Sequence, residues 1–120
     1  MPRQFFIGSV TTTEQFVNLD GLSSVAQHPT AYARGAKTAT AYFEGVAALG
    51  AQDTEVKTYK SVDNGTTWAL QSTDTILHGS TSGSTTPLSL GAGELVSYSV
   101  TATAGGGNAH TLALLSVELT

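Results

Sequence analysis

The sequence predicts an all-β domain, an antiparallel β-sandwich of jelly-roll-like or immunoglobulin-like type with about eight strands. Charged residues make up only 12% of the chain. Thr, Ser, Ala and Gly take their place, which is typical of strands with a hydroxyl-rich wet face and unlike surface helices. Short runs of alternating apolar and polar residues are separated by Gly, Asn, Asp and Ser turns. A chain of 120 residues is long enough for a single domain, residues 1–120, with one core.

The N-terminal half contains three predicted strands. Residues 5–11 form the first and carry apolar side chains on both faces, and residues 15–17 form the second, followed by a turn. Residues 22–37 are irregular and predict an exposed, ordered loop that includes a short helical turn. Residues 38–48 predict a long strand with Ala39, Ala41 and Phe43 on one face and Thr40, Tyr42 and Glu44 on the other. Within it, Gly45 indicates a bulge or close packing.

The C-terminal half contains a hairpin and two long strands. Residues 54–61 and 66–72 are the predicted arms of the hairpin. The polar tract 79–87 predicts an exposed loop because its composition is low in complexity. Residues 95–104 alternate with period two, which predicts a half-buried strand, and residues 110–119 predict a central strand buried on both faces. We expect Leu115, Val117 and Leu119 to point inward.

The hairpin turn, residues 61–68, is the most specific local signal. Asn64 and Gly65 tolerate the positive φ angles that a tight hairpin turn requires. Ser61 and Asp63 have short oxygen-bearing side chains that can accept hydrogen bonds from nearby backbone N–H groups. Trp68 is expected to start the return strand and to be buried as an aromatic anchor. The Asn-Gly pair is also prone to deamidation.

This stretch resembles the Asp-box, Ser-x-Asp-x-Gly-x-Thr-Trp, at every defined position: Ser61, Asp63, Gly65, Thr67 and Trp68. The motif occurs in sialidases, other β-propellers and various β-sandwich proteins, where it is a structural hairpin. The resemblance covers eight of the 120 residues. It implies that Ser61 and Asp63 clamp the turn, that Gly65 has positive φ and that Trp68 fills the core. A propeller needs at least four blades of about four strands, which this chain cannot supply.

Composition argues against several classes of function. The formal net charge is −4 with five basic residues, whereas nucleic-acid binding requires a basic patch. The chain has no cysteine, so disulfides and thiolate chemistry are excluded. The N-terminus does not resemble a signal peptide and no apolar run reaches the roughly 20 residues of a membrane span. We therefore expect synthesis in a cytoplasm and no membrane association.

No residues form a recognisable catalytic, cofactor or metal site. His28, His78 and His110 are far apart in the sequence, and the nearest potential partner of His78 is Asp74. No serine lies in a Gly-x-Ser-x-Gly motif. The carboxylates could include the pair that a glycosidase needs, but Asp63 is expected to be engaged in its turn. We predict a protein that is not an enzyme, and a small hydrolase with paired carboxylates stays an alternative.

The candidate interface residues are apolar or aromatic, with one arginine. Tyr32, Tyr42 and Tyr59 are the tyrosines expected to be partly exposed, and they could form a protein-binding or sugar-binding face. The N-terminal arm, residues 1–10, and the loop 22–37 supply the others: Phe5, Phe6, Ile7 and Arg34.

In overall character the chain resembles the small head-decoration, or cement, proteins of phages and viruses. The resemblance rests on an acidic, cysteine-free, Ser/Thr/Gly/Ala-rich β-sandwich, and it implies a virion location. The expected partner is the major capsid protein or another virion protein, and a homo-oligomer, with a trimer favoured, is also expected. The N-terminal arm and the loops 22–37 and 79–87 would make the contacts. The alternative is a carbohydrate-binding module or a tail or adhesin domain that binds a glycan.

Overall fold

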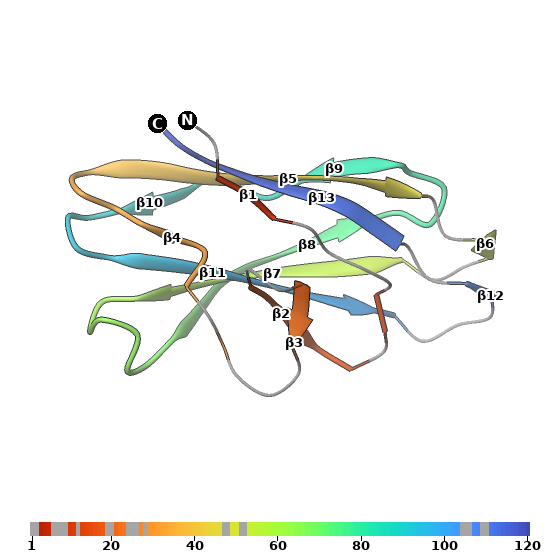
Figure 1. Cartoon of the computed structure of the whole chain (residues 1–120), viewed down its shortest axis with the longest axis horizontal. Helices are drawn as coiled ribbons and strands as arrows, with labels where there is room; N and C mark the ends of the chain where they lie inside the picture. Colours follow the sequence, from red (N-terminus) through yellow and green to blue (C-terminus); the bar gives the residue numbers. More distant parts are fainter. Residues whose placement is uncertain are drawn as a thin grey trace.

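The computed structural model describes residues 3–5, 10–11, 13–18, 21–23, 27, 29–46, 49–50, 53–103, 107–108 and 111–120. Two antiparallel sheets face each other across an apolar layer (Figure 1). The predicted all-β sandwich is confirmed, and the described ranges contain no helix. Nothing in these ranges, accordingly, has the length and apolarity of a bilayer-spanning helix.

Each sheet contains strands from both halves of the chain. The first sheet has the order β1-β13-β5, and β5 then pairs with both β9 and β10. Its strands are β1 (Arg3–Phe5), β5 (Lys37–Val46), β9 (Ser82–Ser84), β10 (Leu88–Leu90) and β13 (Thr111–Leu119). The second sheet has the order β3-β2-β11-β7-β8, and β4 also pairs with β11. Its strands are β2 (Gln15–Asn18), β3 (Gly21–Ser23), β4 (Ala31–Tyr32), β7 (Thr54–Ser61), β8 (Ala69–Ile76) and β11 (Leu95–Ala102). A small extra pair joins β6 (Leu49–Gly50) to β12 (Gly107–Asn108).

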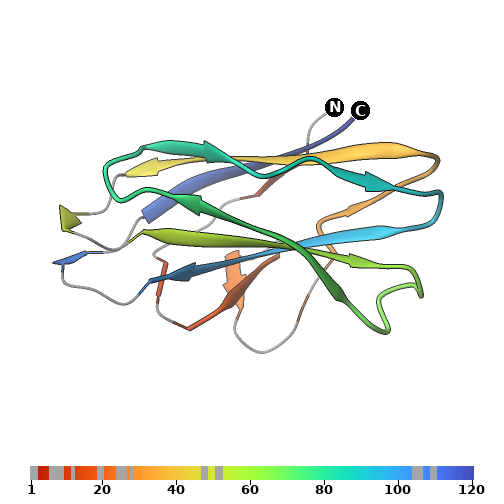
Figure 2. The same ribbon diagram turned by 180° about the vertical axis from the view of Figure 1, so that it is seen from behind.

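The strand order is that of a jelly roll. If β9 and β10 count as one interrupted strand, the main strands pair from the chain ends inward: β1 with β13, β2 with β11, β5 with β9/β10, and β7 with β8. Within each sheet, two of these pairs are joined side by side by a further ladder: β13 with β5 in the first sheet, and β11 with β7 in the second. This long antiparallel ribbon, rolled over on itself, is the double Greek key of the jelly roll. Figure 2, the view from behind, shows β8 in green nearest the viewer at the edge of its sheet, across from β9 and β10 of the other sheet.

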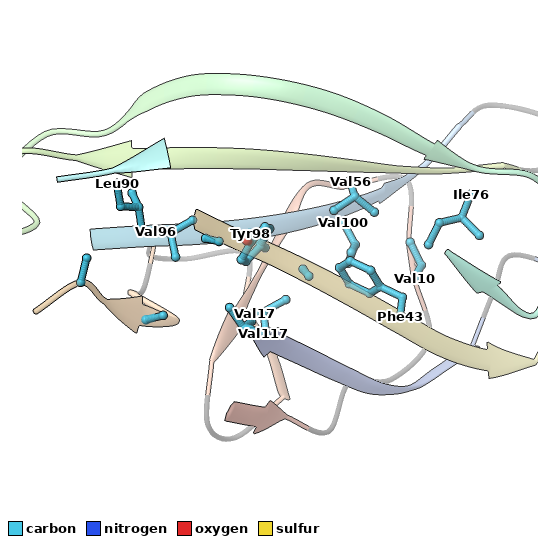
Figure 3. Packing of buried hydrophobic residues seen from close by; sticks show 14 of the residues in the cluster. Val10, Val17, Phe43, Val56, Ile76, Leu90, Val96, Tyr98, Val100 and Val117 are labelled. Carbon is cyan, nitrogen blue, oxygen red and sulfur yellow. The ribbon is translucent and has the colours of Figure 1, made fainter. Parts of the chain in front are cut away.

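The core lies between the inner faces of the two sheets (Figure 3). Strand β11 contributes Val96, Tyr98 and Val100 to the core, all with no exposed surface. Phe43 of β5 and Val117 of β13 face them from the other sheet. The predicted inward face of the last strand is therefore confirmed for Val117, and Leu119 packs against the core. The Leu115 side chain lies outside the part of the chain that the structure describes.

Strand β11 is buried on both faces, so the prediction of a half-buried strand is wrong. Its outward residues Ser97 and Ser99 are also fully buried. Their neighbours are aromatic: Tyr59 is opposite Ser97 on β7, and Phe16 is opposite Ser99 on β2. The Phe16 and Tyr59 rings are only 6.0 Å apart although β11 lies between their strands, so both lean over it. Small serines make room for this cover.

The segment 22–37 is not simply an exposed loop. Thr30, Ala31 and Ala33 are buried, and β4 pairs with the start of β11. The Thr30 N–H donates to Val96 O at 2.8 Å, which places this segment against the sheet. The predicted helical turn falls on residues 24–27, of which 24–26 lie outside the described ranges.

Part of the polar tract 79–87 lies in a sheet, so the prediction of a loop is wrong for residues 82–84, although most of the tract is exposed as expected. Strand β9 pairs with β5, and Gly83 lies opposite Phe43. Just beyond β9, Thr85 is 4% exposed. Its backbone and its side chain each make one hydrogen bond to the backbone of Ala41, in place of the two backbone bonds of a strand pair. Its N–H donates to Ala41 O at 3.0 Å, and its Oγ1 accepts from the Ala41 N–H at 3.0 Å. Low sequence complexity here encodes a strand that passes along the sandwich edge.

The strand pairing also tests the bounds of the first strand and the irregularity predicted at Gly45. The first strand is Arg3–Phe5, earlier than expected, because these residues pair with β13, and residues 6–9 lie outside the described ranges. The irregularity predicted at Gly45 is confirmed. The β5–β13 register shifts between Leu112 and Leu114, opposite Gly45 and Glu44, so the extra residue is on β13.

Candidate functional site

The hairpin turn at residues 61–68 is built as predicted around Ser61 and Asp63. The Ser61 hydroxyl donates to Asp63 Oδ1 at 2.8 Å, and Ser61 Oγ accepts from the Gly65 N–H at 2.8 Å. Asp63 Oδ1 also accepts from the Thr67 N–H at 2.9 Å, and the Thr67 hydroxyl donates to Oδ2. The two side chains therefore satisfy backbone donors on both sides of the bend, which confirms their role as clamps.

The bend itself has two consecutive positive φ angles, 60° at Asn64 and 88° at Gly65. The Thr66 N–H donates to Asp63 O at 3.3 Å, which closes a four-residue turn with the φ pattern of type I′. The predicted positive φ at Gly65 is confirmed. The return strand begins at Ala69 rather than at residue 66, so the tight turn sits inside a longer loop, residues 62–68.

Hydrogen bonds to the Asp63 carboxylate favour its charged form. The Thr67 hydroxyl, the Thr67 N–H and the Ser61 hydroxyl together lower the pKa of Asp63 to about 2. The carboxylate is thus ionised throughout the physiological range, and it works as a structural acceptor.

Trp68 does not fill the core, and this prediction is wrong. The residue is partly exposed and lies outside the core cluster. Its indole rests beside the turn instead: a Cβ placed on Gly65 would be 3.8 Å from Trp68 Cζ2 and 3.6 Å from Leu95 Cδ1. Trp68 precedes β8, where the chain has not yet rejoined the sheet, so its ring reaches the outer layer and not the sandwich interior.

A partly buried carboxylate contact that sequence reasoning missed lies on the same side of the molecule. Glu14 Oε2 accepts from the Tyr59 hydroxyl at 2.7 Å and from the Ser99 hydroxyl at 2.6 Å. Burial, followed by the Glu14 acceptor and its charge, raises the pKa of Tyr59 to about 12, while Ser99 opposes the shift. Glu14 is separated from these partners by 45 and 85 positions, so no local signal could have revealed it.

Several partly exposed apolar side chains share the outer surface of the second sheet. Directly paired residues in antiparallel strands point to the same face. Tyr32 is opposite Leu95, and Leu70 is opposite Tyr59, whereas the alternate residues Ala31 and Val96 belong to the core. Tyr32 is 51% exposed and Leu70 is 52% exposed. We call this surface the outer aromatic face; its members are Phe16, Tyr32, Tyr59, Trp68 and Leu70.

The structure separates the three tyrosines that were expected to form one binding face. Tyr32 and Tyr59 belong to the outer aromatic face. Tyr42 lies on the opposite side of the sandwich, because it alternates with the buried Ala41 and Phe43 on β5.

The remaining candidate interface residues are only partly placed. Arg34 is exposed in the bend that follows β4. Phe5 pairs with Leu115 at the sheet edge, while Phe6 and Ile7 lie outside the described residues.

A shallow hollow of about 310 Å³ lies beside Tyr42. It is lined by Tyr42, Phe43 and Glu44 of β5 and by Ser82, Gly83 and Ser84 of β9. An aromatic ring, a carboxylate and two serines are groups that can contact a sugar. The lining contains one carboxylate, whereas a glycosidase requires two.

His78 is a structurally hydrogen-bonded histidine, and its partner is Asp53 rather than Asp74, the nearest candidate in the sequence. Asp53 Oδ1 accepts from the His78 N–H at 2.8 Å and lies 2.9 Å from His78 Nδ1. Asp74 instead accepts from the N–H and the hydroxyl of Thr86, at 2.9 and 2.7 Å, and so ties β8 to the other sheet. His28 and His110 lie outside the described residues. Among the described residues, no three His, Asp or Glu side chains gather as a metal site would require.

Comparison with known proteins identified no relative. No family model, no curated protein and no solved structure matches this chain.

Proposed function

We propose that this chain is a virion structural protein that decorates and stabilises a capsid shell through protein–protein contacts. The observation that carries the proposal is the outer aromatic face. Tyr, Trp and Phe side chains are enriched where proteins pack against one another. The jelly-roll architecture also agrees with it, because this fold recurs in viral capsid proteins.

Two side chains of the outer aromatic face, Phe16 and Tyr59, are held by their neighbours, which favours binding. The Phe16 and Tyr59 rings contact each other at a 59° tilt above the buried serines of β11. The Tyr59 hydroxyl is fixed on Glu14. Because these side chains are already ordered, a partner that covers them need not supply the entropy of ordering them.

The proposal assigns the contacts to a sheet face more than to loops. Parts of residues 22–37 and 79–87 pair with the two sheets, and Thr30 and Thr85 are buried, so these segments are less loop-like than the sequence suggested. On a symmetric shell each decorating chain would repeat the same modest contact many times, and linked copies in an oligomer, with a trimer favoured, would add avidity. The proposed location is therefore the virion surface.

The test compares exposed residues on the two sides of the sandwich. Tyr32→Ser with Leu70→Ser removes apolar surface from the outer aromatic face, and Tyr42→Ser is the control on the other side. Native mass measurement should show an oligomer for the wild type and the control, with loss of assembly in the double variant. In density-gradient sedimentation of particles from the producing cells, the wild type and the control should be found in the particle fractions, and the double variant should be absent from them. A monomeric wild type that does not sediment with any particle would reject the proposal.

A carbohydrate-binding module is the second candidate, and the hollow beside Tyr42 favours it. In this case a glycan array should give hits that Tyr42→Ala abolishes and Tyr32→Ala preserves. Absence of any hit with the folded wild-type chain would eliminate this candidate.

A further inference from the structure

The Asn64–Gly65 pair in the hairpin turn can undergo a spontaneous chemical reaction that is separate from its structural role. Gly65 has no side chain to shield its backbone nitrogen, and Asn64 is exposed. In a flexible chain, this nitrogen attacks the neighbouring side-chain amide. The turn therefore presents a site of spontaneous modification at the surface.

We propose that Asn64 is a deamidation site whose rate is set by Ser61, because Ser61 holds the attacking nitrogen of Gly65. The reaction begins when the Gly65 nitrogen loses its proton and forms a bond to Asn64 Cγ. The side-chain nitrogen of Asn64 leaves as ammonia, and a five-membered succinimide results. Water then opens either carbonyl of that ring and yields aspartate or isoaspartate. The balance is one water consumed and one ammonia released, and no oxidant or reductant takes part.

The geometry opposes the first step of this reaction. The Gly65 N–H donates to Ser61 Oγ at 2.8 Å, so removing its proton also removes a hydrogen bond. The acceptor cannot easily turn away, because Ser61 is fully buried and its hydroxyl donates to Asp63 Oδ1 at 2.8 Å. The turn closed by Thr66 N–H and Asp63 O further fixes the backbone on both sides of the bond. Local opening of the loop must precede attack.

The products would change the loop. Either product adds one negative charge to a chain of formal net charge −4, and places it next to the ionised Asp63. Aspartate could keep the left-handed conformation of position 64. Isoaspartate lengthens the backbone by one atom, which is incompatible with the contact between Asp63 O and Thr66 N–H. The modification would therefore loosen the clamp that Ser61 and Asp63 form.

The experiment follows Asn64 by peptide mapping and mass spectrometry in mildly alkaline buffer. Folded wild-type protein should deamidate more slowly than the same chain unfolded in urea. Ser61→Ala should raise the folded-state rate roughly three- to tenfold, the range set by the net contribution of one hydrogen bond. Thr66→Val is the matched control: it removes an exposed hydroxyl from the same loop but keeps the Ser61–Gly65 contact and the bonds to Asp63, so its rate should stay near that of the wild type.

Equal rates in the folded and unfolded wild type, or in wild type and folded Ser61→Ala, would overturn the proposal. If Ser61→Ala does not fold, amide hydrogen exchange of the wild type decides. Protection of the Gly65 N–H supports the proposal, and exchange at the rate of the unfolded chain rejects it. Both readouts are independent of capsid or glycan binding.

Discussion

Thr85→Val tests how the polar tract after β8 is built into the sandwich. Valine has nearly the shape of threonine but lacks the hydroxyl. The Ala41 N–H would lose its acceptor, Thr85 Oγ1 at 3.0 Å, in a place where Ala41 has no exposed surface. A buried donor without a partner costs about 1–3 kcal/mol. We expect the free energy of unfolding to fall by that amount.

The assay is urea unfolding followed by intrinsic fluorescence. With a slope of about 1.5 kcal/mol/M, the midpoint should fall by roughly 0.7–2 M at an unchanged slope. The control is Thr75→Val on β8, where the side chain is exposed, and the expected change is within about 0.5 kcal/mol. Thr85→Ser retains the acceptor and loses only a methyl group, worth about 0.8 kcal/mol.

Amide exchange at Ala41 separates the lost acceptor from lost packing. The valine variant should expose this amide to faster exchange, and the serine variant should keep it protected. Wild-type stability for Thr85→Val, or equal Ala41 exchange in both variants, would refute the assignment of Thr85 as a substitute for a strand pair.

Three further predictions concern the Asp63 clamp, Tyr59 and Gly83. The pKa of Asp63 is lowered from 3.8 to about 2. The ionised clamp therefore contributes its full stability above pH 4 and loses it as the pH falls toward 2. In acid titrations, the difference in stability between the wild type and Asp63→Asn should close over that range. The pKa of Tyr59 is raised from 10.0 to about 12, so the stability of the wild type should fall as the pH rises from 10 through 12. In thermal melts over this range, Tyr59→Phe should lose less stability than the wild type, because it has no hydroxyl to ionise. Gly83→Ala places a Cβ 2.9 Å from Ile76 Cγ1 and should lower the free energy of unfolding in urea by about 1–3 kcal/mol. Gly79→Ala is the control, because no atom lies within 4 Å of the added Cβ, and it should leave the stability unchanged. Similar stability of the two variants would contradict the close packing at Gly83.

The sequence predicted best where the structure depends on neighbours in the chain. Ser61, Asp63 and Gly65 act within a few residues of each other, so their roles could be derived from side-chain length and φ tolerance alone. Trp68 was misplaced because the turn type does not state where the return strand begins. The burial of Ser97 and Ser99 depends on rings from β2 and β7, and a period-two pattern cannot contain that information.

Composition misled the prediction for the tract 79–87. Its Ser, Thr and Gly residues favour a loop when judged locally, yet Gly83 is opposite Phe43 and Thr85 contacts Ala41 across more than 40 positions. Glu14 was overlooked for the same reason, since its partners are remote in sequence. The candidate site was foreseen only in part: Tyr32 and Tyr59 do share a surface, and Tyr42 belongs to the other side.

The pairing of β1 with β13 has a consequence for how this molecule reaches its native state. Arg3 is opposite Val117, so the first and last main strands can meet only after nearly the whole chain has been synthesised. The β7–β8 hairpin, by contrast, can assemble from adjacent segments. Ladders between remote segments slow folding, because a large loop must close before its contacts form. We expect β7 and β8 to organise early and β1 to dock late, which leaves β1 as the strand most easily exchanged between copies.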